Sequence, residues 1–194
     1  MNDVHGFDFD LVRRMPSRSA GRQSTYLSLA GTAGQYGEVT VTVGTVTRQA
    51  TLAGPGLPEA SVSHPDDLKQ GGLILIDERT GLSVGGRQAT LTWNRRPLGK
   101  KGRGIRIGLG DRDYAYLRIG TGEEELRDAE HGPLVRQRNR FGRSTVGVTV
   151  LSAADSIDLA LALVLQGTDR TGLTITQMAV FGVLSYLYPG HGDV

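Results

Sequence analysis

Cysteine is absent from this chain of 194 residues. Its absence excludes a disulfide framework, a thiolate metal site and a cysteine nucleophile, and it fits a protein that works in a reducing compartment. The first ten residues, M-N-D-V-H-G-F-D-F-D, carry acids where a signal peptide has a basic head and an apolar run. We therefore expect a cytoplasmic protein, able to attach peripherally to a membrane surface.

An excess of charge of one sign is also missing. The 22 basic and 20 acidic residues give a formal net charge of +2, so the chain is not polybasic. Aromatic residues make up only 6% of the chain and none lies between Arg95 and Arg106, so a surface that stacks nucleic-acid bases is not expected. The most apolar stretch, residues 157–165, is too short to cross a hydrocarbon core about 30 Å thick at about 1.5 Å per residue. No transmembrane segment is expected.

Glycine, in contrast, is plentiful. The 28 glycines are scattered between short segments in which apolar and polar residues alternate, a pattern typical of strands joined by tight turns. This pattern predicts a mainly β protein, either a barrel or a sandwich. About eleven strands are expected, at residues 25–29, 38–43, 47–52, 73–77, 82–84, 88–93, 104–109, 114–119, 124–127, 134–138 and 144–151.

One stretch predicts a buried helix. Residues 155–167, D-S-I-D-L-A-L-A-L-V-L-Q-G, are apolar from position 157 to 165 except at Asp158. A helix that is apolar on every face needs neighbours all around it. We therefore predict a closed or nearly closed antiparallel barrel around this helix, since a barrel covers every face and removes the sheet edges. A further C-terminal helix, residues 173–187, is expected outside the barrel.

The ends of this helix carry recognisable signals. Ser152 and Asp155 have the spacing of a capping box, Asp155 is itself a favourable N-cap residue, and Gly167 stands where a helix ends in the left-handed conformation.

Domain organisation follows from the same patterns. Residues 1–23 show no period and are expected to form a flexible N-terminal arm with an apolar anchor at 7–12. This arm is interpreted either as a docking peptide for a protein partner or as a lead-in strand or frayed tail. Residues 24–194 are expected to form one barrel-like domain. The segment 54–70 contains three prolines and is predicted to be a loop.

The order of strands followed by V-T-V-L and A-A-D-S-I-D-L-A-L-A-L-V-L resembles the tubby-like barrels, in particular the LURP-one-related and phospholipid-scramblase-like group. The resemblance covers roughly residues 25–167 in pattern and the helix in residue type. It implies a barrel wrapped around a C-terminal hydrophobic helix, and an anionic lipid or phosphate head group as ligand. This chain continues for 27 residues beyond Gly167. Asp155 and Asp158 are too few oxygen ligands for calcium, so no metal or cofactor is expected.

A basic segment is the main candidate binding site. Glycine-containing segments of this kind offer cations and backbone N–H groups to phosphate or anionic head groups, although a solvated hairpin would have the same composition. A second basic set, Arg136, Arg138 and Arg140, has the alternate spacing that places side chains on one face of a strand, and Arg143 can extend it. The predicted anionic-ligand residues are Arg95, Arg96, Lys100, Lys101, Arg103 and Arg106.

Catalytic patterns are weaker. G-L-S-V-G at residues 81–85 matches the nucleophile elbow around Ser83, but a strand is predicted after it where that chemistry needs a helix. We therefore expect a non-enzymatic binding or structural module with no catalytic residues, and keep a hydrolase with a site not visible in the linear sequence as the alternative. The four histidines, His5, His64, His131 and His191, are expected in exposed loops or tails without metal-ligand spacing.

Overall fold

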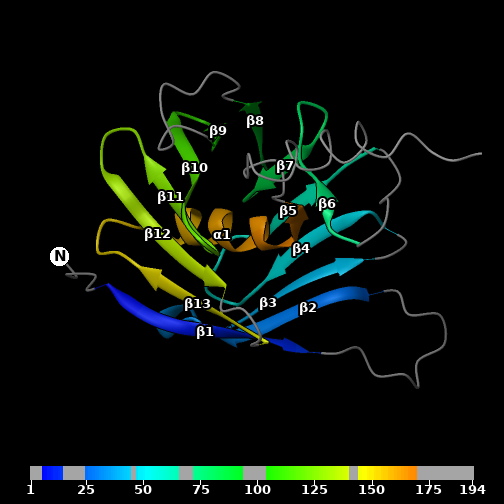
Figure 1. The fold of residues 1–194 in the computed structure, drawn as a ribbon. Coiled ribbons are helices and arrows are strands. Elements are labelled where there is room, and N and C mark those ends of the chain that lie inside the picture. Colours follow the sequence, from blue (N-terminus) through cyan, green and yellow to red (C-terminus); the bar gives the residue numbers. More distant parts are fainter. Residues whose placement is uncertain are drawn as a thin grey trace, which may run out of the picture.

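The computed structural model describes residues 6–14, 25–44, 47–65, 72–93, 104–139 and 144–169. Within them, twelve antiparallel strands close into a barrel, and α1 (Ser156–Val164) lies inside it (Figure 1). The prediction of a mainly β protein with a barrel around the apolar helix is confirmed. The second helix, expected at 173–187, lies outside the described residues.

The strands follow one another around the wall nearly in chain order, and the pair β1–β13 closes the barrel. Two short strands, β6 and β14, pair in parallel outside it. The barrel strands are β1 (Phe7–Arg14), β2 (Thr25–Thr32), β3 (Glu38–Gly44), β4 (Gln49–Ala53), β5 (Ala60–Ser63), β7 (Gly81–Val84), β8 (Arg87–Trp93), β9 (Gly104–Leu109), β10 (Arg112–Gly120), β11 (Glu123–Asp128), β12 (Gly132–Asn139) and β13 (Thr145–Val150); β6 is Ile74–Leu75 and β14 is Thr168–Asp169.

Apolar and polar side chains alternate along the strands, which gives the barrel wall an apolar inner face and a polar outer face. In β3, Val39, Val41 and Val43 are fully buried, while the threonines between them lie on the other face. Residues two apart share one face of a strand, so β-branched residues at every second position line the interior. The same alternation recurs in β13, whose valines 146, 148 and 150 are buried.

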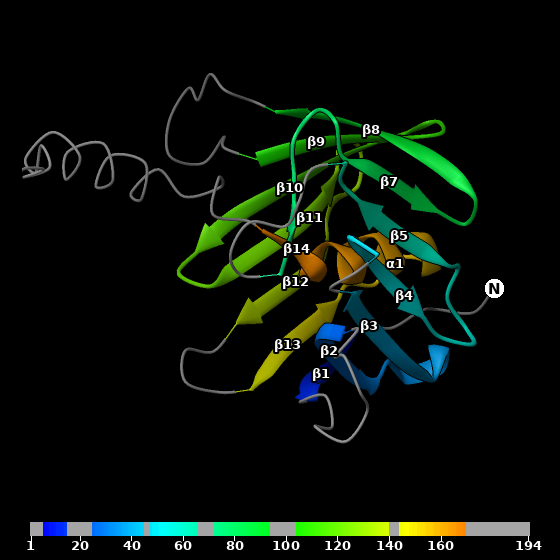
Figure 2. The ribbon, with the colours of Figure 1, turned by 90° about the vertical axis from the view of Figure 1, so that its right-hand side faces the viewer.

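The helix fills the interior. Every residue from 159 to 165 has no exposed surface, and strands surround α1 in two perpendicular views (Figures 1 and 2). Leu159, Leu161, Leu163 and Leu165 belong to the same hydrophobic core as the wall residues. Burying each leucine side chain contributes about 1.5–3 kcal/mol to the stability of the fold. The requirement that the helix be covered on every face is met.

Asp155 is the N-cap residue, as predicted, but the capping box and the C-terminal end of the helix differ from the prediction. The capping box runs from Asp155 to Asp158: the Asp155 carboxylate accepts the backbone N–H groups of Ile157 and Asp158, and Asp158 accepts the N–H of Asp155 at 2.9 Å. Ser152 plays no part in it. Gly167 ends a 3-10 turn, Leu165–Gly167, without a positive φ. Glycine is required at position 167 by close packing, because a Cβ there would lie 2.4 Å from the Cβ of Ala50.

Two segments differ from the prediction. Residues 7–14, within the predicted arm, form β1 between β13 and β2, which agrees with the lead-in strand interpretation and not with a flexible segment. The segment F-D-F-D-L does have a period of two, with Leu11 fully buried and the aspartates exposed. Residues 60–63, assigned to the loop 54–70, form β5 between β4 and β7. The predicted strand 73–77 is limited to β6, since a turn runs from Asp77 to Thr80, where the Thr80 N–H donates to the carbonyl of Asp77 and its hydroxyl donates to that of Leu75.

The two ends of the barrel have different connections. We call the end where α1 begins the cap end; here tight turns join β7 to β8, β9 to β10 and β11 to β12. We call the opposite end, where the 3-10 turn follows α1, the exit end; β1, β3, β8 and β12 all finish there. Among the described residues, no helix is long and apolar enough to cross a membrane.

Candidate functional site

The interior of the barrel is filled, so a ligand site is expected on its outside. In a barrel that holds a ligand, the interior is open; here α1 occupies it and the residues from 159 to 165 are fully buried. Any ligand therefore meets the outer wall or one of the two ends.

Arg112 clamps the start of α1 at the cap end. Its guanidinium lies 2.8 Å from the Asp155 carboxylate and 3.1 Å from that of Asp158. The Tyr114 hydroxyl donates to Asp158 at 2.7 Å. The sequence G-D-R-D-Y predicts only the turn before β10, because the partners of Arg112 lie more than forty residues further along the chain.

The contacts of this clamp, formed by Arg112, Tyr114, Asp155 and Asp158, shift the pKa values of its acidic groups. Burial alone would raise the pKa of Asp155, but hydrogen bonds from Arg112 and the helix N–H groups outweigh it and lower that pKa. Burial raises the pKa of Asp158, and the neighbouring Asp155 charge acts in the same direction. Burial likewise raises the pKa of Tyr114. These groups are already paired with one another, so the clamp positions the helix.

Acids surround a hollow of about 430 Å³ beside this clamp. Asp128 accepts from His131 and from the backbone N–H groups of Glu130 and His131, which lower its pKa, the His131 N–H most of all. No group of acids and histidines in the described part of the chain has an arrangement that could hold a metal ion. The cap end is therefore acidic, with Asp111 and Asp113 exposed.

A second polar cluster ties the other half of the helix to the wall. Gln137 donates to the carbonyl of Ala162 at 2.9 Å and accepts from Gln166. The Tyr116 hydroxyl lies 2.8 Å from the Glu124 carboxylate and 2.9 Å from the Gln137 amide oxygen, so its single proton serves one of them at a time. All these side chains are buried. The cluster is a buried hydrogen-bond network that joins the helix to the wall.

The predicted anionic-ligand residues fall mostly outside the described residues. Arg95, Arg96, Lys100, Lys101 and Arg103 belong to the segment that joins β8 to β9. Arg106 lies on β9, exposed, two residues from the exit end. Strand β8 finishes and β9 begins at that end, so the segment is attached to the exit end at both of its limits.

Apolar and basic side chains share the exit end. The four large apolar side chains that are most exposed in the described chain all belong to it: Val12 (44%), Tyr26 (39%), Leu75 (44%) and Ile119 (47%). Ile119 is the bulged residue that has no partner between β10 and β11. The exposed side chains of Arg13, Arg14 and Arg106 make no ion pair with the rest of the described chain.

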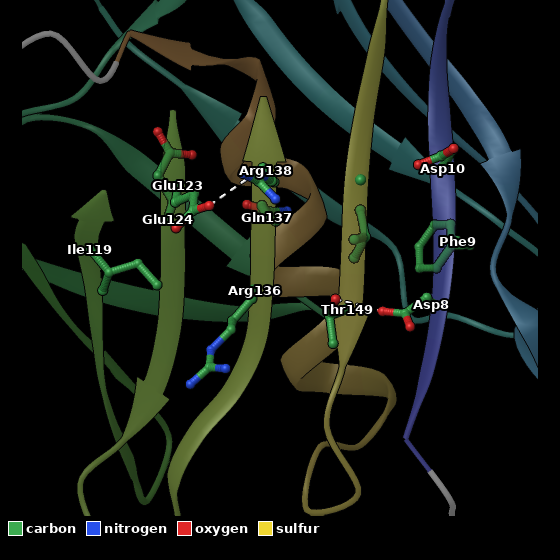
Figure 3. Close-up of a pocket in the computed structure, with 12 residues that line it drawn as sticks. Asp8, Phe9, Asp10, Ile119, Glu123, Glu124, Arg136, Gln137, Arg138 and Thr149 are labelled. Atoms are coloured by element: carbon green, nitrogen blue, oxygen red, sulfur yellow. Dashed lines mark hydrogen bonds and ion pairs between the residues drawn. The ribbon is translucent and has the colours of Figure 1, made fainter. Parts of the chain in front are cut away.

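A trough of about 680 Å³ crosses the outer wall at strand β13. Figure 3 shows Asp8 and Asp10 on β1 at one side and Arg136 and Arg138 on β12 at the other. The prediction that alternate spacing puts these two arginines on one face of a strand is confirmed, whereas Arg140 and Arg143 lie outside the described residues. The floor between them is Gly147 and Thr149.

The catalytic patterns find no support in the described chain. Ser83 lies in β7 before a turn in which Gly85 and Gly86 both have positive φ, and β8 follows, so the motif is a hairpin. No hydrogen bond joins Ser83 to a histidine of the described residues.

The histidine prediction was wrong for His64, which is buried and lies 3.0 Å from Asp77. Burial acts to raise the pKa of Asp77, but the Arg79 N–H and His64 outweigh it. His131 is exposed, as expected, and His5 and His191 lie outside the described residues.

Comparisons with family models, curated proteins and solved structures found no match to this chain, so the resemblance to tubby-like barrels stays a prediction.

Proposed function

We propose that this protein is a non-enzymatic binding module that attaches the exit end of its barrel to an anionic lipid surface. The observation that carries this proposal is the sharing of one barrel end by the exposed apolar side chains and by Arg13, Arg14 and Arg106, which have no ion pair among the described residues. Apolar groups beside arginines are the composition of surfaces that bind peripherally to membranes.

The arrangement around the rim favours a flat partner. Val12 and Tyr26 lie on β1 and β2, whereas Ile119 and Arg106 lie on β10 and β9, several strands away around the barrel. A small ligand would need these groups in one hollow. A membrane surface can meet side chains spread around a ring.

The charge distribution orients the molecule. The exposed Asp111, Asp113 and Glu130 stand at the cap end, so an anionic surface repels that end and attracts the other. Attraction amounts to about 1 kcal/mol per basic residue near the surface and falls off within a Debye length of about 8 Å. The sequence adds five basic residues between β8 and β9, at 95, 96, 100, 101 and 103. Binding is therefore expected to be reversible and strongly salt-dependent.

Vesicle co-sedimentation tests the proposal. Vesicles with phosphatidylserine should bind the protein at low salt, vesicles of phosphatidylcholine alone should bind much less, and high salt should release it. Replacing Arg13, Arg14 and Arg106 together by Gln should weaken binding at least five-fold, about 1 kcal/mol or more.

The matched control is Arg87→Gln, an exposed arginine at the cap end. It should leave binding unchanged. Replacing the six basic residues at positions 95 to 106 should abolish binding. Equal binding to anionic and neutral vesicles, or equal loss in Arg87→Gln and the triple variant, would overturn the proposal.

A further inference from the structure

The trough over β13 has walls of opposite charge. Its strands place residues in rows across the barrel wall: Asp10 pairs with Gly147, Gly147 with Arg138, and Arg138 with Glu123. In the next row Asp8 pairs with Thr149, which pairs with Arg136. Each row thus begins with a carboxylate on β1 and reaches a guanidinium on β12, with a small residue between them.

Both walls offer unused hydrogen-bonding capacity. Arg138 contacts Glu123 at 3.0 Å and Arg136 contacts Glu125 at 2.8 Å, in both cases through Nε. The η nitrogens of the two guanidiniums make no hydrogen bond within the described chain. The carboxylate of Asp10 likewise makes none with the described residues, whereas Asp8 accepts from Thr149.

The glycine on the floor is not explained by the fold. Gly147 has no positive φ, and a Cβ there would meet its nearest atom, Asp10 Oδ1, at an ordinary 3.5 Å. Valine or threonine suits an exposed strand position better than glycine, which weakens a strand unless another group must approach the backbone. The absence of a side chain at Gly147 keeps the space between Asp10 and Arg138 open. This position points to a ligand that lies on the floor.

We propose that the trough binds a small zwitterion, with its oxyanion on Arg136 and Arg138 and its ammonium group on Asp10. Guanidinium η nitrogens bind a phosphate ester or a carboxylate through paired hydrogen bonds. Adjacent strands lie about 4.8 Å apart, so β1 and β12 are about 10 Å apart across β13. The two guanidinium groups reach toward Glu123 and Glu125 on β11, whereas Asp10 Oδ1 lies over Gly147, so the ligand would span β13 between them. The volume of about 680 Å³ is that of a small-molecule site.

This proposal goes beyond attachment to an anionic surface and does not depend on it. The trough lies on the wall, and its ligand is recognised by both charges at once. Such a zwitterion can be a free small molecule or the head group of a neutral phospholipid. The chemistry recognised is the same, and a soluble probe separates the two sources.

Titration by NMR chemical shifts, using the whole chain, tests it. O-phosphoethanolamine and glycylglycine supply an ammonium group with a phosphate or a carboxylate, while inorganic phosphate and ethanolamine supply one charge each. At least one zwitterion should bind ten-fold or more tightly than either single-charge probe. Vesicles of phosphatidylethanolamine and phosphatidylcholine without anionic lipid then show whether the head group is also bound in a membrane.

Variants assign the contacts. Arg138→Gln should lose binding of the zwitterion at least ten-fold, and Asp10→Asn should reduce its affinity to that of inorganic phosphate. Gly147→Val should lose binding without lowering the melting temperature, which a purely structural glycine would not show. Arg87→Gln, outside the trough, should change nothing. Failure of both zwitterions to bind better than phosphate, or full binding by Gly147→Val, overturns the proposal whatever the result with anionic vesicles.

Discussion

Truncation of Leu161 tests whether the helix is packed against the wall on every side. Its side chain is fully buried at the middle of α1. Leu→Ala replacements in protein cores cost about 2.7–5 kcal/mol, depending on how far the site can collapse. A closed wall of paired strands resists collapse, so we expect the upper part of this range, about 3–5 kcal/mol.

The assay is chemical and thermal unfolding followed by circular dichroism. For a domain of this size each kcal/mol lowers the melting temperature by about 2–4 °C, so Leu161→Ala should melt about 6–20 °C below the parent. The control is Leu75→Ala, whose side chain is 44% exposed; it should cost less than about 1 kcal/mol. A cost below about 1 kcal/mol for Leu161→Ala would refute a helix enclosed by the barrel.

Three other predictions concern the ends of the helix. Arg112→Gln leaves Asp158 buried beside Asp155 and should cost about 1–3 kcal/mol of unfolding free energy in urea. The lowered pKa of Asp155 stabilises the fold above its unfolded value, and this contribution is lost as pH falls through the folded value. Asp155→Asn should therefore destabilise the protein at pH 7, and its difference from the parent should shrink below about pH 4; a constant difference would contradict this. Gly167→Ala should lower the melting temperature, since its Cβ would collide with Ala50; an unchanged melting temperature would show that the wall can move.

The sequence was enough to predict those helices and strands whose residues carry a hydrophobic pattern of their own. The helix at 156–164 was predictable because a segment apolar on every face needs enclosure, and β3 because its valines alternate. Strand β1 was predicted only as one alternative for the N-terminal arm, because its partner β13 lies at the other end of the chain. Strand β5 was missed because it is short and lies among the prolines of the segment 54–70.

The candidate sites were also predictable only where they depend on residues close together in the sequence. Spacing alone placed Arg136 and Arg138 on one face. It could not show that Asp10 faces them across β13, or that Arg112 holds Asp155, because both depend on register between distant strands and elements. Exposure of Ile119 follows from a bulge that the sequence does not signal.

The orientation of the barrel on a membrane is the most direct test of the proposed function. The chain has no cysteine, so a single cysteine at position 75, 119 or 86 carries a spin label at a unique site. With phosphatidylserine vesicles, labels at 75 and 119, at the exit end, should become accessible to oxygen dissolved in the lipid, while a label at 86, at the cap end, should remain in water. Lipid contact at position 86, or none at positions 75 and 119 when the protein is bound, would contradict attachment through the exit end.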